Sequence, residues 1–229
     1  MKKVALGTVL AALISGPVFA YDTGDFIFRS GAITVSPDVS SSALALGSVA
    51  LDGTAAEVAD GTALSLIGTY MLRDHWGLEV IAATPFSHDL EVSGLGETFD
   101  LGETKHLPPT VMLQYYPLQA SSSVQPYIGL GLNYTAFFDE EVSGEANAVF
   151  ATLGASGDAD LSLKNSTGMA AEAGVDIAFG ADQRWLLNLA VWWMDIDTEA
   201  RVDVPGVGKV AADVELDPLV YSAGFGYRF

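Results

Sequence analysis

Six charged residues stand singly inside otherwise apolar segments, where they could perform acid–base chemistry or form ion pairs. They are Arg29, Arg73, Glu79, Glu172, Asp176 and Arg228. Neighbouring carboxylates can act as a general acid and a general base. However, opposite charges in a poorly solvated interior pair and hydrogen-bond with one another. Because the three cations match the three anions, we predict that the six form structural ion pairs, a polar plug, and are not catalytic.

The remaining reactive side chains give no catalytic or metal-binding signature. His75, His88 and His106 stand in neither a Ser-His-Asp arrangement nor a metal-ligand spacing. The glycine-rich stretch GLGLNYT (129–135) lacks the Lys-Ser/Thr pair of a phosphate-binding loop. The chain contains no cysteine. We therefore predict no enzyme activity, no catalytic residue, no metal site and no cofactor.

Eight segments with strand-like patterning would position these residues. They span 25–36, 63–73, 76–86, 108–117, 125–138, 167–180, 184–195 and 214–229. Each is about ten residues long or longer, as a tilted strand must be to cross a bilayer. In PLVYSAGFGYRF (218–229), apolar side chains alternate with small or polar ones. This period of two is typical of strands with one apolar face.

The bulk composition agrees with short apolar strands in an exported chain. Half of the 229 residues are hydrophobic and the mean hydropathy is +0.33, yet the formal charge is −19. After residue 20 there is no run of about 18 apolar residues, which a helical span would need. Residues 1–20 combine two lysines, an apolar stretch and the small-residue motif VFA (18–20), which predicts a cleaved bacterial signal peptide. Residues 21–229 are then expected to form a single domain.

The connections between the eight segments alternate in length. Long ones span 37–62, 87–107, 139–166 and 196–213, and short ones span 73–76, 117–124 and 180–184. This alternation is typical of bacterial outer-membrane barrels, and only helices and closed barrels satisfy every backbone group in hydrocarbon. We predict an all-β fold: an eight-stranded antiparallel transmembrane β-barrel with long extracellular loops, short periplasmic turns and its apolar face outward. A soluble lipocalin-like barrel, with the apolar face inward, is the alternative.

Side-chain parity separates the two neighbouring tryptophans of RWLLNLAVWWMDID (184–197). Trp193 faces lipid, and aromatic residues near other strand ends, including Tyr115 and Tyr116, fit the interfacial girdles. Trp192 faces inward. Three apolar residues, Ile81, Trp192 and Met194, occupy inward positions near the long-loop ends of their strands. They predict either an apolar pocket above the polar plug or mere packing beneath folded loops, and parity alone favours neither.

The four long loops carry most of the 29 carboxylates. An acidic rim could bind divalent cations shared with anionic lipid head groups, or it could simply remain solvated. The stretch Asp195-Ile196-Asp197 is too short to predict a calcium site. The excess of acidic residues also argues against a nucleic-acid partner, since nucleic acids select basic surfaces.

At this level of detail the chain resembles the OmpW family of outer-membrane proteins, of the OmpW and AlkL type. The matching stretches are GLEVIAATPFSHD (77–89), KHLPPTVMLQYYP (105–117), PYIGLGLNYTAFFD (126–139), VWWMDIDTEA (191–200) and LDPLVYSAGFGYRF (216–229). They follow one another in order and cover most of the chain after residue 20. Residues 143–158 and the first long loop diverge, so a loop-borne ligand preference does not transfer.

The resemblance implies a hydrophobic channel in the extracellular half of the barrel, with Ile81 and Trp192 at lining positions. Small hydrophobic solutes would enter there, bypass the lipopolysaccharide layer and leave sideways into the membrane lipids. Pro108 and Pro109 cannot donate ladder hydrogen bonds, and we predict that they form a lateral gate. The resemblance also makes the terminal Phe229 a signal for the barrel-assembly machinery.

Two functions from different classes therefore remain open. The first is an outer-membrane channel for passive uptake of small hydrophobic molecules. The second is a structural or interaction barrel whose acidic loops bind cations or surfaces. An apolar lumen would favour the first function, and a fully packed lumen would favour the second.

Overall fold

The computed structural model describes residues 21–94, 96 and 98–229, so the predicted signal peptide lies outside the described residues. The elements are β1 (Phe26–Ser36), β2 (Ser40–Ser41), β3 (Ala45–Leu46), β4 (Val49–Ala50), β5 (Ala55–Val58), β6 (Gly61–Arg73), β7 (Trp76–Ala83), β8 (Phe86–Ser93), β9 (Phe99–Leu107), β10 (Thr110–Tyr115), β11 (Val124–Val142), α1 (Gly144–Thr152), β12 (Asp160–Leu163), β13 (Ser166–Phe179), β14 (Trp185–Met194), β15 (Asp197–Val204), β16 (Gly208–Glu215) and β17 (Leu219–Arg228). Across the described ranges, no helix has both the length and the apolar character needed to traverse a membrane.

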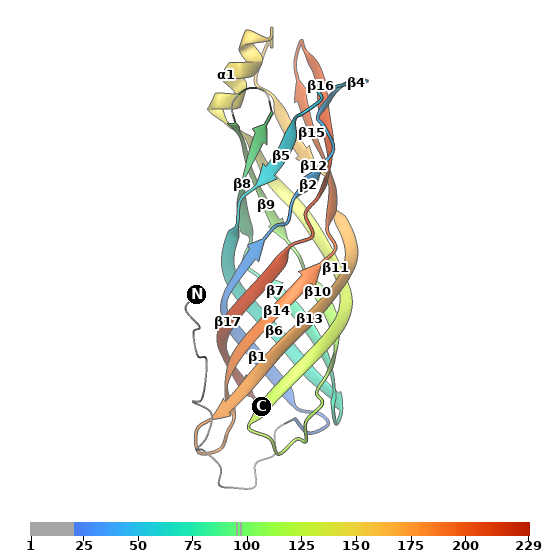
Figure 1. Cartoon of the computed structure of the whole chain (residues 1–229). Helices are drawn as coiled ribbons and strands as arrows, with labels where there is room; N and C mark the ends of the chain where they lie inside the picture. The colour runs from blue at the N-terminus through green and yellow to red at the C-terminus, as the bar shows by residue number, and fades with distance from the viewer. Residues whose placement is uncertain (1–20, 95, 97) are drawn as a thin grey trace, which may run out of the picture.

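Eight strands close into a barrel, as the sequence predicts (Figure 1). Their order is β10-β7-β6-β1-β17-β14-β13-β11, and β10 pairs with β11 to complete the ring. Neighbouring strands are antiparallel, with Phe28 opposite Tyr227 on one side of β1 and opposite Gly68 on the other. The chain terminus at Phe229 lies at the end that carries the short turns, and the long connections rise from the opposite end.

The barrel turns its apolar face outward. On β11, Leu130 and Leu132 are 63% and 65% exposed, whereas Asn133 and Thr135 point inward and are almost fully buried. On β17, Tyr221 and Phe225 are exposed in the same way. An exposed apolar belt around a polar interior is stable in lipid and costly in water. The lipocalin-like alternative, which requires the reverse arrangement, is therefore wrong.

Glycines in the wall make room for large side chains in the lumen. A Cβ atom added at Gly129 would lie 2.4 Å from Glu172 Oε1, and one added at Gly174 would lie 2.3 Å from Tyr127 Cζ. An eight-stranded barrel encloses little more volume than its inward side chains fill. Inward-facing glycines such as Gly129 and Gly174 thus leave the space that bulky inward side chains such as Glu172 and Tyr127 occupy.

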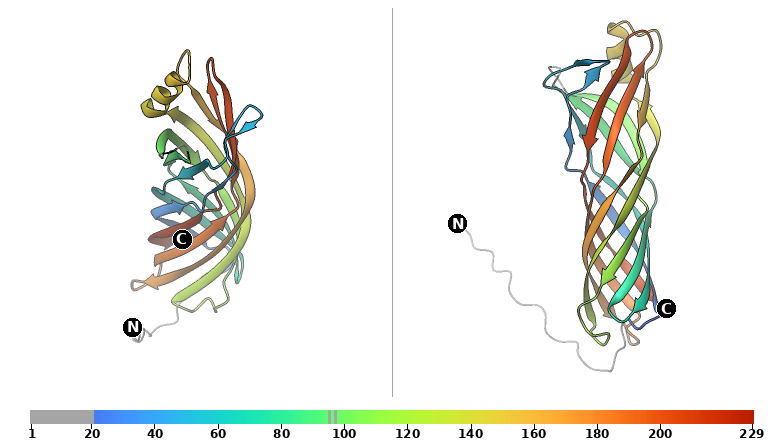
Figure 2. Two further views of the ribbon diagram at one scale, coloured as in Figure 1. Left: turned by 45° about the horizontal axis from the view of Figure 1, so that its top comes forward. Right: turned by 90° about the vertical axis from the view of Figure 1, so that its right-hand side faces the viewer.

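The long connections are folded, and they extend the barrel wall well beyond the eight-stranded ring (Figure 2). The β8–β9 hairpin pairs with the upper part of β11, and the β15–β16 hairpin pairs with β12 and with β2 and β3 of the first connection. Helix α1 lies at the far tip. These segments were expected as long loops between the eight predicted strands, yet β15 alternates buried Val202 and Val204 with exposed Arg201 and Asp203. Their period of two is the signal of a strand.

Candidate binding site: an apolar pocket above a buried polar network

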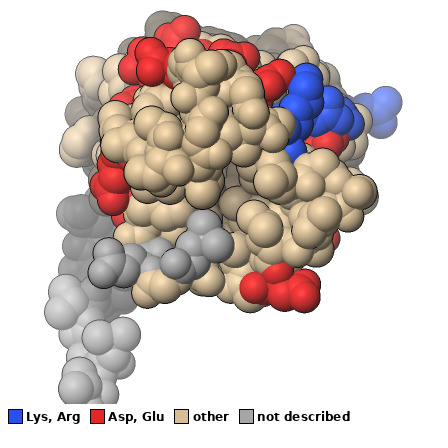
Figure 3. Space-filling model, turned by 90° about the horizontal axis from the view of Figure 1, so that it is seen from above, with Lys and Arg blue, Asp and Glu red and all other residues tan. Residues whose placement is uncertain are grey.

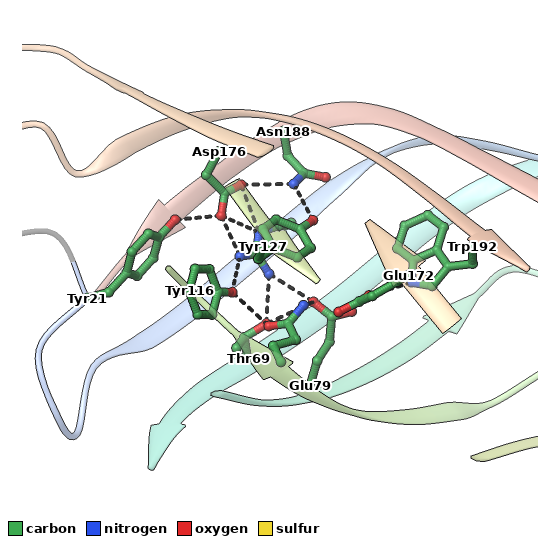
Figure 4. A network of polar contacts seen from close by, with 11 residues as sticks. Tyr21, Thr69, Glu79, Tyr116, Tyr127, Glu172, Asp176, Asn188 and Trp192 are labelled. Atoms are coloured by element: carbon green, nitrogen blue, oxygen red, sulfur yellow. Dashed lines mark hydrogen bonds and ion pairs between the residues drawn. The ribbon is translucent and has the colours of Figure 1, made fainter. Parts of the chain in front are cut away.

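Arg29, on β1, is the centre of a hydrogen-bonded network in the lumen near the short-turn end (Figure 4). Its Nη1 donates to Glu79 Oε2 at 3.0 Å and to Thr69 Oγ1 at 2.7 Å. Its Nε donates to Asp176 Oδ1 at 3.0 Å, and its Nη2 donates to Tyr116 OH at 3.1 Å. All five side chains are buried. A buried guanidinium is tolerated when, as here, carboxylates and hydroxyls occupy its donors.

Asp176, on β13, is fixed from several further directions. Tyr21 OH donates to its Oδ2, and Asn188 Nδ2 donates to its Oδ1 at 2.8 Å. The same Asn188 amide donates to Tyr127 OH at 2.8 Å, and the ring centroid of Tyr127 lies 5.2 Å from the Arg29 guanidinium carbon. The aromatic face adds a cation–π attraction to the ion pairs. Because Tyr21 reaches in from below the strands, it closes the network at the short-turn end.

The upper side of the network is formed by two glutamates. Gln114 Nε2 donates to Glu79 Oε2 at 2.7 Å, and Trp192 Nε1 donates to Glu172 Oε2 at 2.6 Å. Glu79 and Glu172 point toward one another across the lumen (Figure 4). We call the whole group the lumen network. It consists of Tyr21, Arg29, Thr69, Glu79, Gln114, Tyr116, Tyr127, Glu172, Asp176, Asn188 and Trp192.

Four of the six residues predicted for the polar plug therefore meet, and two do not. Arg73 is exposed, because the β6–β7 register shifts between Met71 and Arg73, and Met71 takes the inward position. Arg228 lies at the short-turn rim, where its Nη1 pairs with Asp25 Oδ2 at 3.1 Å. The placement of Tyr116 in the outer girdle is also wrong. It is 1% exposed inside the lumen, a position that its two-residue spacing from Gln114 indicates.

An apolar pocket lies above the lumen network. Its wall comes from β1, β5, β8, β9, β11, β12, β15 and β16 and from the segments beside them. The apolar wall residues are Val35, Pro37, Ala56, Val58, Leu90, Leu101, Phe137, Leu163, Ile196, Ala200, Val214, Leu216 and Pro218. The polar ones are Glu57, His88, Glu91, Thr104, His106, Thr135 and Thr198. Concave, largely apolar sites with a few polar groups are typical of small-molecule binding.

The three residues predicted to line a channel lie in the barrel interior beneath this pocket. Ile81, Trp192 and Met194 are each 2% exposed or less, and they belong to the same apolar core as Ile196 and Leu216 in the pocket wall. None of the three lines the pocket itself. Trp192 also differs from a purely apolar lining residue, because its indole N–H is bonded to Glu172. Their role as channel lining stays a prediction.

His88 and His106 belong to no motif in the sequence, yet the structure brings them together with Thr104 in the pocket wall. His88 on β8 and His106 on β9 stack with their ring centroids 4.8 Å apart, and Thr104 is the cross-strand partner of His88. These strands lie outside the eight-stranded ring. Burial lowers the pKa of His106 to about 3, with His88 as a second cause, and burial also lowers the pKa of His88. Both imidazoles are therefore neutral at pH 7.

Comparison with known proteins agrees with this architecture. The model of the OmpW family matches residues 22–229. The chain belongs to the OmpW family. Outer membrane protein W of Vibrio cholerae is 43% identical over 100% of both chains. The crystal structure of the outer membrane protein OprG from Pseudomonas aeruginosa has a TM-score of 0.84 and 45% identity, covering 93% of this chain and 99% of its own. The dibenzothiophene metabolism operon protein PahQ of P. aeruginosa is 28% identical over 94% of this chain and 93% of its own.

As an OmpW-family barrel, the chain resides in the bacterial outer membrane, with its short turns periplasmic and its long connections extracellular. The apolar pocket consequently lies on the extracellular side of the barrel. The relative from Vibrio cholerae and OprG are both named as outer membrane proteins. Phe229 is exposed at the periplasmic end, 4.9 Å from Tyr227 and 6.0 Å from Phe26 between ring centroids.

The extracellular end of this OmpW-family barrel carries many acidic side chains (Figure 3). Asp195, Asp197 and Asp217 bring carboxylate oxygens within 4.8 Å of one another where β14 ends. Partial burial and the two neighbouring aspartates raise the pKa of Asp197. Asp195 and Asp197 are two residues apart in the sequence, whereas Asp217 lies just before β17. The sequence alone therefore does not indicate the group of three. Exposed carboxylates often gather without an ion, so the cluster does not by itself establish a cation site.

Proposed function

We propose that the chain is an outer-membrane channel through which small hydrophobic molecules pass without energy input. The apolar pocket on the extracellular side carries this proposal. A barrel that acts only through its acidic loops does not require such a pocket. A barrel that carries an apolar solute past the lipopolysaccharide layer does require an apolar site of this kind. The relationship to PahQ, which is named for a dibenzothiophene metabolism operon, supports an apolar substrate class.

We infer that the lumen network blocks an apolar solute from passing straight down the barrel to the periplasm. Arg29, Glu79 and Asp176 are each 1% exposed or less, and their side chains fill the lumen together with three buried tyrosines. An apolar solute would have to break charge-assisted hydrogen bonds to pass, and it would replace none of them. A solute that enters the pocket therefore leaves most easily through the barrel wall.

An interruption in the wall supplies a candidate exit. The β7–β10 ladder ends with Ile81 opposite Thr110, and the β8–β9 ladder resumes with Phe86 opposite His106. Between these pairs, residues 82–85 and residues 107–109 form no backbone pair with each other, although each segment still contacts the strand on its other side. Three of these residues are prolines, which have no N–H to donate: Pro85, Pro108 and Pro109. His106, at the upper edge of the interruption, also lines the pocket.

The other side of the same segment is closed. Tyr134 N donates to Pro109 O at 3.0 Å, and Ala136 pairs with Leu107. The interruption is thus confined to the seam between β7–β8 and β10–β9. Ile81 at its lower edge is buried and faces the lumen beneath the pocket, where a residue lining a lateral exit would lie.

Uptake of naphthalene by cells that make either the wild-type chain or a pocket-filling variant tests this proposal. Ala200→Trp places an indole in the pocket, since Ala200 is a wall residue. Ala211→Trp is the matched control on the adjacent strand, because Ala211 lies opposite Arg201 on the other face of the β15–β16 hairpin. We expect Ala200→Trp alone to reduce uptake, by about tenfold if the pocket is blocked.

Equal uptake by the two variants, with equal amounts of folded barrel in the membrane, would contradict the proposal. That outcome would favour the alternative of a structural or interaction barrel with acidic loops that bind cations or surfaces.

A further inference from the structure

Three polar side chains form a compact group in the wall of the apolar pocket. His88 and Thr104 are cross-strand partners on β8 and β9, and His106 follows Thr104 on the same face. We call these three residues the imidazole patch. They are 3%, 2% and 4% exposed, respectively. All three line the pocket, among side chains that are mostly aliphatic.

Each residue of the imidazole patch carries an atom without a protein partner. His88 Nε2, Thr104 Oγ1 and His106 Nε2 are buried and make no hydrogen bond to any group in the described part of the chain. The other hydroxyls of the pocket differ. Thr135 Oγ1 donates to Asn133 Oδ1 at 2.7 Å, and Thr198 Oγ1 donates to the Lys164 carbonyl at 2.7 Å. Buried polar groups without partners are rare and point to a ligand or another function.

The imidazole rings are held in place rather than free to turn. His106 stacks on Phe86 with 5.2 Å between centroids and on His88 with 4.8 Å. Gly61 lies against the edge of the His88 ring, where an added Cβ atom would be 2.7 Å from Nε2. A rigid polar group in an apolar wall is suited to orient a ligand with little loss of entropy.

Hydrogen-bond chemistry defines what the patch can bind. His88 Nδ1 lies 2.6 Å from the Ala59 carbonyl oxygen, which only accepts, so this nitrogen carries the proton. His88 Nε2 is therefore an acceptor, whereas the Thr104 hydroxyl can both donate and accept. A neutral hydroxyl matches this combination of groups.

We propose that the imidazole patch makes the pocket selective for small apolar molecules that carry one neutral hydroxyl group, such as phenols and alcohols, over the corresponding hydrocarbons. The hydrocarbon part occupies the aliphatic wall, and the hydroxyl bonds to the patch. This inference rests on the proposed uptake function and names the substrate class of its pocket.

Binding of 2-naphthol and naphthalene to the full barrel in phosphatidylcholine nanodiscs tests the inference. The two probes differ by one hydroxyl, and partition into empty nanodiscs is subtracted. We expect the wild-type chain to prefer 2-naphthol by about tenfold, the effect of one added hydrogen bond. Thr104→Val and His106→Phe should each reduce this preference to about twofold or less and leave naphthalene affinity unchanged. Thr198→Val is the control, because it removes a pocket hydroxyl that is already bonded to backbone.

The binding results distinguish a failure of the hydroxyl selectivity from a failure of the proposed uptake function. If both probes bind equally in the wild-type chain, the pocket remains a hydrophobic site and the imidazole-patch selectivity is overturned. If the Thr104→Val variant and the His106→Phe variant both keep the wild-type preference for 2-naphthol over naphthalene, the selectivity is overturned as well. If neither probe binds the folded wild-type chain, the proposed uptake function fails together with this inference.

Discussion

Trp192 Nε1 donates a hydrogen bond of 2.6 Å to Glu172 Oε2, so the indole lies at the boundary between the lumen network and the apolar core above it. The tryptophan is fully buried. Its ring contributes to the apolar side, and its N–H satisfies one oxygen of a buried carboxyl group. One residue thus joins the polar and apolar halves of the lumen.

Trp192→Phe should destabilise the barrel, because it keeps an aromatic ring but removes a partner of Glu172. We expect a loss of about 1–3 kcal/mol in the free energy of unfolding, the usual cost of an unsatisfied buried polar group. The neighbouring Trp193→Phe is the control, since Trp193 is 41% exposed on the lipid side. Urea unfolding of both variants in lipid vesicles measures the difference. Equal losses would contradict the structural role assigned to the indole N–H.

Arg29→Met should be more damaging, because it leaves the carboxyl groups of Glu79 and Asp176 buried without their cation. Breaking a buried ion pair by removing one partner costs about 3–5 kcal/mol. The control is Arg201→Met. The Arg201 side chain is 55% exposed in its ion pair with Glu199, so its loss should change the free energy of unfolding very little. The same urea unfolding assay distinguishes them. An Arg29→Met barrel as stable as the wild-type chain would show that the lumen network is not a structural core.

The buried imidazoles should make stability depend on pH. An unfolded histidine titrates near pH 6.5, whereas burial lowers the pKa of folded His106 to about 3. Below pH 6.5 the unfolded chain therefore binds a proton that the folded chain does not, and the free energy of unfolding falls as pH falls. One such group contributes a loss of about 1.4 kcal/mol per pH unit. This contribution should disappear above about pH 7.

His106→Gln removes that contribution, so the difference between its urea midpoints at pH 7.5 and pH 5 should be smaller than in the wild-type chain. His75→Gln serves as the control in the periplasmic turn. The same pH dependence in all three proteins would mean that His106 is not buried in its neutral form.

The double substitution Pro108→Ala and Pro109→Ala tests the lateral exit. It restores two backbone N–H donors where the ladder is interrupted, and added cross-strand bonds would narrow the seam. We expect naphthalene uptake to slow severalfold while the binding affinity of the pocket stays the same. Pro117→Ala, in the connection that follows β10, is the control. Unchanged uptake in the double variant would exclude this seam as the rate-limiting exit.

Much of the barrel could be predicted from residue spacing alone. The period of two in β17 and the alternating connection lengths were enough to predict the strand number and the outward apolar face. The same parity placed Trp192 inside and Trp193 outside. Parity fails where a strand is irregular, as at Arg73, because one shifted residue exchanges the inward and outward sets.

The contacts of the candidate site could not be predicted in this way. His88 and His106 lie far apart in the sequence, and they meet only because β8 and β9 form a hairpin in what reads as an acidic loop. Tyr21 presents a similar problem, since it precedes the first strand and reaches Asp176 across 155 residues. Such contacts depend on how loops and termini fold over the barrel, which local periodicity does not encode.

The position of a bound apolar solute tests the central claim most directly. Intermolecular nuclear Overhauser effects can be measured between naphthalene and methyl-labelled protein in nanodiscs of deuterated lipid. The account predicts contacts to Val214 and Leu216 in the pocket and to Ile81 at the seam, and none to Met71 near the periplasmic end of the lumen. Contacts confined to outward residues such as Leu130 and Leu132 would contradict the account, because they would place the solute only in the surrounding lipid.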